Sequence, residues 1–259
     1  MSTAAVTVAQ ERVWEALSTV RDPELDRPIT ELGFVTEATV REQPSGRSVL
    51  IRLRLPTYFC APNFAYLMTA DAHAAVRALP GTEAVEVRLE DHFAADEINA
   101  AVAARTGFKE AFPRQAKGEL AELRLTFLQK GYLAAQGRLG KRLTERGWTV
   151  RQMAEARLRD LPDDLAGPLV RRRRALDLAS GGDEPVFTDE LGRGVLPAEV
   201  ESHLKRGRTT AVGIAVNTEL CEGLLATRYG PHEPPAEVSA TSRDRRGADA
   251  PTVASGDVA

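Results

Sequence analysis

Residues 33–55, GFVTEATVREQPSGRSVLIRLRL, contain two stretches of alternating side chains around a short turn. In the second stretch, one expected face carries Val49, Ile51, Leu53 and Leu55, and the other carries Leu50, Arg52 and Arg54. In the first stretch, Phe34, Thr36, Ala38 and Val40 are expected to share a face. A period of two residues is typical of strands that cover a core with one face. Because QPSG at residues 43–46 predicts a turn, residues 33–55 are expected to form a β-hairpin.

The segments on either side extend this hairpin into an α/β unit. Apolar residues recur at helical spacing over residues 6–20, and Pro23 ends this helix because proline disfavours the helical conformation of the residue before it. A second helix is expected between Pro62 and Pro80, and residues 82–89 alternate as a third strand. The order α-β-β-α-β places the chain in the α+β class, with a first domain over residues 1–110.

A mostly helical second domain is expected over residues 116–230. A capping box of Thr149 and Gln152 opens one of its helices. Helical patterns cover residues 118–146, 149–161, 163–178, 197–205 and 219–229.

Two parts of the C-terminal half are expected not to be helical. The β-branched run at residues 209–216 predicts a strand. Residues 231–259 are rich in Pro, Gly, Ala, Ser and charge, so they cannot repay the entropy of ordering and are expected to form a disordered tail.

Composition excludes several classes of protein. The 259 residues are 43% hydrophobic and 27% charged with a net charge of -3, which is typical of a globular protein and excludes nucleic-acid binding by bulk positive charge. No apolar run approaches the roughly 20 residues that span a bilayer, and the N-terminus has no secretory pattern, so a cytoplasmic protein is expected. With only 2 cysteines, one chain cannot supply a four-thiolate metal site.

The candidate functional residues are Cys60, Asp22 and Glu24. If the two hairpin strands pair antiparallel, the end of the second lies near the start of the first, which brings Cys60 toward the Asp22–Glu24 loop. Cys60 also precedes the helix that Pro62 starts, where the helix dipole favours the thiolate that binds metal. From the residues alone, a buried structural cysteine and a simple helix-stop turn are the more frequent explanation.

Three segments favour the functional interpretation over the structural one: VWEALSTVRDPELDRPITELGFV, VLIRLRLPTYFCAPNF and VRALPGTEAVEVRLEDHF. Together they resemble the iron–sulfur cluster assembly domain family, which includes the PaaD and SufT proteins and the N-terminal extensions of some Mrp-type ATPases. The resemblance covers residues 8–95. It rests on a helix ending in Asp-Pro-Glu-Leu, on Ile-x-x-Leu-Gly before the first strand, and on a cysteine and a proline before the second helix.

This resemblance implies a compact α/β fold with a small mixed sheet and a role in iron–sulfur cluster assembly or in maturing metal-containing enzymes. It implies Cys60 as the metal ligand, and Asp22 and Glu24 match the acidic turn of the family. The usual Cys-Pro is here Cys60-Ala61-Pro62, so the helix start is displaced by one residue.

A closer resemblance is carried by residues 57–81 and 89–108. They look like a branch of the family associated with bacterial multicomponent diiron monooxygenase systems. The client would then be a monooxygenase component, either its diiron hydroxylase or its iron–sulfur reductase.

The main hypothesis is an accessory factor that is not an enzyme and that holds iron or an iron–sulfur cluster transiently through Cys60, with Asp22 and Glu24 completing the site. Its partners would be a client metalloenzyme or the iron–sulfur assembly machinery, and a homo-oligomer is compatible with the helical domain. The alternative is a metal-independent protein-binding scaffold or folding chaperone for an oxygenase subunit. Specific DNA binding is disfavoured because the helical domain carries little excess positive charge.

Three other groups of residues have a structural and a functional interpretation. Residues 90–92, Glu-Asp-His, could ligate metal but more often form a solvated turn. Cys221 lies between carboxylates that raise the pKa of a thiol, so a buried structural cysteine is expected. The cations at residues 171–174 must spread around a helix, which favours a solvated or partner-facing surface.

Overall fold

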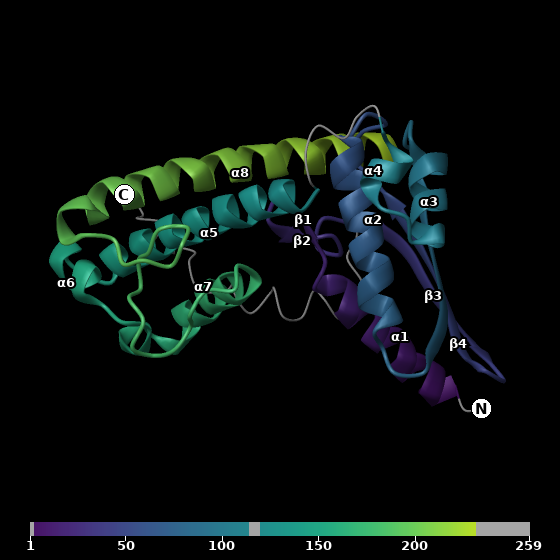
Figure 1. Ribbon diagram of the computed structural model, residues 1–259, viewed down its shortest axis with the longest axis horizontal. Coiled ribbons are helices and arrows are strands. Elements are labelled where there is room, and N and C mark those ends of the chain that lie inside the picture. The colour runs from purple at the N-terminus through teal and green to yellow at the C-terminus, as the bar shows by residue number, and fades with distance from the viewer. Residues whose placement is uncertain (1–2, 114–119, 232–259) are drawn as a thin grey trace, which may run out of the picture.

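The structure is a computed structural model that describes residues 3–113 and 120–231. Its N-terminal unit contains the expected α-β-β-α-β order and adds two short strands after the first helix and two helices after the last strand (Figure 1). These elements are α1 (Thr3–Ser18), β1 (Arg21–Asp22), β2 (Arg27–Pro28), β3 (Val35–Gln43), β4 (Gly46–Arg54), α2 (Pro62–Arg77), β5 (Thr82–Glu90), α3 (Ala95–Ala104) and α4 (Phe108–Ala111).

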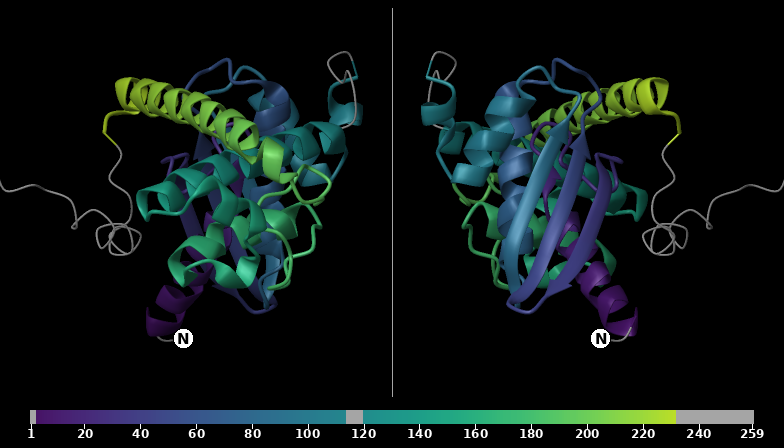
Figure 2. Two further views of the ribbon diagram at one scale, coloured as in Figure 1. Left: turned by 90° about the vertical axis from the view of Figure 1, so that its left-hand side faces the viewer. Right: turned by 90° about the vertical axis from the view of Figure 1, so that its right-hand side faces the viewer.

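A small mixed sheet of three strands forms the centre of this unit, as the resemblance implied. Its order is β3-β4-β5, with β3 and β4 antiparallel and β4 and β5 parallel, so α2 is the crossover between parallel strands. Helices cover one face of the sheet, and the right-hand view of Figure 2 shows the other face open. Val49, Ile51 and Leu53 are buried under the helices, whereas Arg52 and Arg54 reach Glu90 on the open face.

The first strand differs from its sequence pattern at one position. Phe34 and Val35 are both buried, and Thr36 is exposed. The pairing of β3 with β4 shifts register between Val35 and Glu37, which inserts an extra residue and reverses the alternation. Placing Thr36 on the face of Phe34 was therefore wrong, because a bulge leaves no mark in a period-two pattern.

The C-terminal half is mostly helical, as expected. It contains α5 (Leu120–Glu145), α6 (Val150–Glu155), the 3-10 turn η1 (Leu158–Asp160), α7 (Asp163–Ala175), the 3-10 turn η2 (Pro197–Glu199) and α8 (Val200–Tyr229). The capping box is confirmed: the Gln152 backbone N donates to Thr149 Oγ1 at 3.2 Å, and the Thr149 backbone N donates to Gln152 Oε1 at 2.8 Å.

The strand expected at residues 209–216 is wrong, because this segment lies inside the 30-residue helix α8. Packing against α5 overrides the β-branched composition. A Cβ on Gly207 would lie 2.7 Å from Leu133 O, so glycine is needed where the two helices meet. The hydroxyls of Thr209 and Thr210 donate to backbone carbonyls one turn earlier, which keeps them compatible with a helix.

Two hydrophobic cores lie at the two ends of the molecule. The first packs the sheet against α1 and α2 and includes Leu225 from the far end of α8; the second lies among α5, α7 and the start of α8. Figure 1 shows α8 running the length of the molecule from one region to the other. The C-terminal helix therefore returns to the N-terminal unit.

Two expectations lie outside the described residues. They are the helix start expected at residue 118, within the undescribed residues 114–119, and the tail expected beyond residue 231. The domain boundaries therefore stay predictions. Across residues 3–113 and 120–231, no helix combines the length and the apolar character needed to cross a membrane.

Candidate functional site

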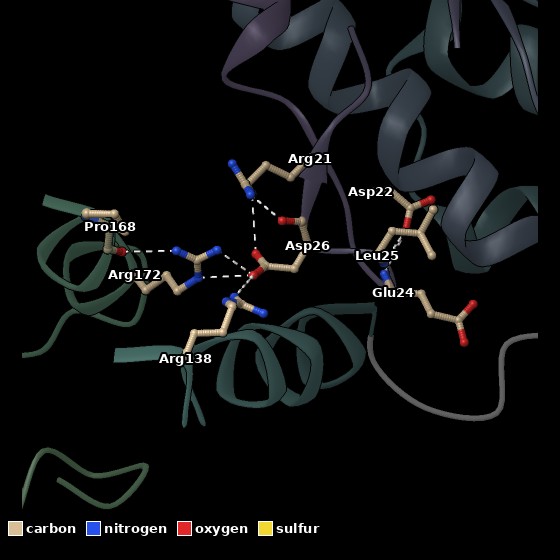
Figure 3. Close-up of polar contacts among 8 residues, drawn as sticks. All are labelled: Arg21, Asp22, Glu24, Leu25, Asp26, Arg138, Pro168 and Arg172. Carbon is tan, nitrogen blue, oxygen red and sulfur yellow. Dashed lines mark hydrogen bonds and ion pairs between the residues drawn. The ribbon is translucent and has the colours of Figure 1, made fainter. Parts of the chain in front are cut away.

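Asp22 stands at the start of a tight loop between β1 and β2. Its Oδ1 accepts hydrogen bonds from the backbone N–H groups of Glu24 at 2.8 Å and Leu25 at 2.7 Å (Figure 3). The side chain is buried, and burial raises its pKa to about 6, although the two backbone hydrogen bonds act in the opposite direction. Asp22 therefore fixes the shape of the loop, with one carboxylate oxygen already engaged.

Asp26, at the other end of this loop, joins the N-terminal unit to the helical region. Its backbone is left-handed, with φ 51°. Its carboxylate receives Arg21 Nε at 3.3 Å, Arg172 Nε at 3.0 Å and Arg138 Nη2 at 3.5 Å (Figure 3). Arg138 belongs to α5 and Arg172 to α7, so two helices are tied to one aspartate. No local sequence pattern marks Asp26, because both helical partners lie far along the chain.

Cys60 lies in the loop between β4 and α2 and is half-buried. Its Sγ is 3.4 Å from Thr57 Oγ1, and Ala61 separates it from Pro62, the first residue of α2. Its backbone O accepts from His92 Nε2 at 2.7 Å. The thiol is thus held at the mouth of α2 by a loop that is anchored on both sides.

The Glu-Asp-His run at residues 90–92 is engaged in other contacts and does not face a metal site. Glu90 pairs with arginines of β4, and Asp91 accepts from Tyr229 O–H at 3.2 Å. His92 Nδ1 accepts from the Ala94 backbone N at 3.2 Å, so Nε2 carries the proton that it donates to Cys60. Burial lowers the pKa of His92, which keeps the ring neutral.

The second cysteine reaches the same neighbourhood from α8. Asn217 Nδ2 donates to Glu24 Oε1 at 3.3 Å, and Arg228 Nη1 donates to Leu55 O at 3.2 Å, so this face of α8 covers the two loops. Cys221 lies between these contacts, one turn after Asn217.

The electrostatics of the second thiol agree with this placement. Burial, together with the charges of Asp22, Cys60 and Glu24, raises the pKa of Cys221 to about 11. The three residues predicted from the sequence thus share Cys221 as an electrostatic neighbour. Cys221 joins this neighbourhood, although the sequence favours a structural role for it and does not place it beside Cys60.

These side chains do not form a closed metal site. Within the two described ranges, no three His, Cys, Asp or Glu side chains gather closely enough to hold a metal ion. Thiolates are the ligands that iron–sulfur clusters prefer, and carboxylates can bind iron as additional ligands. The neighbourhood thus offers suitable donor atoms in an incomplete set.

Three exposed aromatic rings surround the Cys60 loop. Tyr58, Phe59 and Phe93 are 46%, 75% and 42% exposed, and their ring centroids lie 5.0 to 6.3 Å apart. Aromatic side chains of this kind are enriched at protein interfaces. The candidate site therefore opens onto an apolar surface, hereafter the aromatic patch.

Comparison with known proteins finds a family match in the N-terminal unit. Residues 10–89 match the family model described as iron–sulfur cluster assembly protein, which covers α1 to β5 and leaves α5 to α8 outside. An uncharacterized protein of Methanocaldococcus jannaschii is 33% identical over 93 residues, which are 36% of this chain and 92% of that protein. The chain therefore belongs to the family of iron–sulfur cluster assembly proteins, and its general role lies in iron–sulfur cluster assembly.

Proposed function

We propose that this protein is an accessory factor, not an enzyme, that holds iron or an iron–sulfur cluster transiently through Cys60 and transfers it to a client metalloenzyme. The observation that carries the proposal is the half-buried Cys60 thiol, fixed at the mouth of α2 within the electrostatic neighbourhood of Cys221 and two carboxylates. Iron or a cluster is the cargo of such a factor. An incomplete ligand set suits cargo that must leave again.

Each residue of the site has a distinct proposed role. Cys60 supplies the thiolate. Asp22 keeps the loop in shape, because its Oδ1 accepts two backbone hydrogen bonds. Glu24 supplies a carboxylate whose orientation is set by the hydrogen bond from Asn217. Cys221 supplies a second thiol from the helical region. Cargo bound by both thiols would therefore link α8 to the Cys60 loop.

The aromatic patch supports docking of a protein partner beside the cargo. Phe59 is adjacent to Cys60 in sequence and is 75% exposed, so a partner that covers the ring would lie beside the loop that carries the thiol. A client docked there could complete the ligand set with its own side chains. We propose a component of a diiron monooxygenase, its hydroxylase or its iron–sulfur reductase, as the client on the basis of sequence resemblance.

Anaerobic reconstitution with iron and sulfide tests the proposed function. Wild type, Cys60→Ala, Cys221→Ala and the cysteine-free double variant are compared by visible absorption and by iron bound per chain. We expect Cys60→Ala to bind no more iron than the cysteine-free variant, and Cys221→Ala to bind an intermediate amount. Equal binding by wild type and Cys60→Ala would contradict the proposal.

A metal-independent scaffold or folding chaperone for an oxygenase subunit is the second candidate, and the exposure of the aromatic patch favours it. Binding of purified oxygenase subunits is measured with chelator present. The scaffold predicts binding that survives Cys60→Ala and is lost in Phe59→Ser. The cargo-holding factor predicts that chelation and Cys60→Ala both weaken the complex.

A further inference from the structure

One side of α8 presents a row of apolar side chains to solvent. Val212, Val216, Leu220 and Leu224 are 62%, 57%, 61% and 37% exposed. They follow one another at every fourth position, so they lie along one side of the helix. We call these four residues the α8 stripe.

The opposite side of the same helix is buried, so α8 carries apolar side chains both on its buried side and on its exposed side. Ile214, Thr218 and Leu225 face the rest of the chain and are nearly inaccessible. Single exposed apolar residues are ordinary, but a continuous row of them marks an interaction surface. The stripe is also approachable, because a Cβ at Gly213 or Gly223 would meet nothing within 4 Å.

The charges beside the stripe show which occupant fits. Arg208 and Glu219 are both exposed and stand eleven positions apart, about three helical turns, so they lie on the same edge of the stripe. A second copy in parallel orientation would turn this edge of the two helices to opposite sides of the contact, so Arg208 and Glu219 could not meet. An antiparallel copy places Arg208 of one helix on the same edge as Glu219 of the other, so the charges are complementary.

We propose that α8 pairs antiparallel with α8 of a second copy of this chain, with the two-fold axis near Val216. Val216 then packs against its own equivalent, and Val212 packs against Leu220 of the other chain. The interface runs along the outer side of the helical segment that carries Asn217 and Cys221 on its inner side. This pairing does not depend on metal binding, so it stands apart from the cargo-holding role.

Sedimentation velocity of the full chain over a range of concentrations tests the pairing. Wild type is expected to sediment as a dimer of the 28.1 kDa chain. The variant Val216→Glu/Leu220→Glu is expected to be monomeric, because it places charges in the apolar contact. Its circular dichroism and urea midpoint are compared with wild type to show that it folds. Leu125→Glu, which also replaces an exposed apolar residue but on α5, is the matched control and should leave the dimer intact.

A charge-swap series tests the antiparallel orientation. Arg208→Glu and Glu219→Arg are each expected to weaken dimerisation by about tenfold, and the double variant is expected to recover most of that loss. A monomeric wild type, or a dimer that survives Val216→Glu/Leu220→Glu, would overturn the proposal. Additive weakening in the double variant would overturn the antiparallel arrangement.

Discussion

The N-terminal unit and the helical region each surround a hydrophobic core, but they bury polar side chains in different ways. In the N-terminal unit, buried polar side chains bond to backbone groups: Asp22 to Leu25, Thr69 to Ala65 and His92 to Cys60. In the helical region they bond to one another across the fold. That set comprises Tyr132, Gln136, Arg173, Thr188 and His203.

Thr188, in the loop before α8, is the centre of this second network. Its Oγ1 lies 2.7 Å from Tyr132 Oη, its N donates to Gln136 Oε1 at 2.9 Å, and its O accepts from Gln136 Nε2 at 3.1 Å. Arg173 Nε donates to Tyr132 Oη at 3.0 Å. This network connects α5, α7 and the loop before α8, and its directional bonds fix their relative positions. The N-terminal unit, by contrast, is held together mainly by the packing of its apolar side chains.

The largest loss of stability should come from replacing Arg173, the positively charged residue of this network. Arg173 is 1% exposed and donates to the backbone carbonyls of Ala179, Pro185 and Val186. Arg173→Met leaves these acceptors unsatisfied, so we expect a loss of about 3 kcal/mol in the free energy of unfolding. The measurement is urea unfolding in a Trp14→Phe background, where Trp148, packed on the second core, is the remaining tryptophan.

The neighbouring arginine supplies the control. Arg174 is exposed, and Arg174→Met is expected to change stability by no more than about 0.5 kcal/mol. If the two variants unfold at the same urea concentration, the helical region depends on apolar packing alone, and the contrast with the N-terminal unit disappears.

The second effect sharpens the comparison from the N-terminal side. The folded pKa of Asp22, about 6, lies above the ordinary value of 3.8. This group therefore stabilises the fold at pH below about 4, and that contribution is lost as the pH rises to about 6. The two pKa units correspond to at most about 3 kcal/mol, and backbone relaxation should reduce this to about 2 kcal/mol.

Asp22→Asn tests this pH dependence because the amide keeps an acceptor oxygen and does not ionise. We expect wild type to lose stability relative to the variant between about pH 4 and pH 6. Urea unfolding is followed by Trp14, packed on the first core, in a Trp148→Phe background. Parallel stability curves for the two proteins would contradict the assignment.

The fold of the N-terminal unit could be predicted because its determinants are close in sequence. The alternation in residues 48–55 identified the buried face of β4 correctly, since each strand residue alternates regardless of distant contacts. The exceptions had causes that no local pattern carries. The bulge near Thr36 depends on pairing with β4, and the helical state of residues 209–216 depends on α5.

The candidate site was predicted only in part for the same reason. Hairpin geometry predicts that Cys60 lies toward the Asp22–Glu24 loop, whereas Cys221 reaches this neighbourhood because α8 returns to the N-terminal unit. The four cations at residues 171–174 show the same limit. Arg172 and Arg173 are not the solvated surface expected, because one pairs with Asp26 and the other enters the core.

The smallest effect should come from the contact that joins the two regions. Asp26→Asn removes the carboxylate between Arg21, Arg138 and Arg172 and leaves three positive groups together. Partial exposure of two of these arginines screens the interaction, so we expect a loss of about 1 kcal/mol. The loss should fall as salt is added, because added ions screen the repulsion among the arginines.

The distinguishing measurement for Asp26→Asn is whether the urea midpoints of the two regions separate. Since the carboxylate belongs to neither core, Asp26→Asn should move the urea midpoints reported by Trp14 and by Trp148 apart, whereas Arg173→Met should act mainly on Trp148. Glu31→Gln, which removes an exposed carboxylate 3.6 Å from Arg27 within the N-terminal unit, is the matched control and should move neither. If Asp26→Asn shifts both midpoints equally, the two regions unfold as one cooperative unit, and their difference lies in how polar groups are buried, not in separate stability.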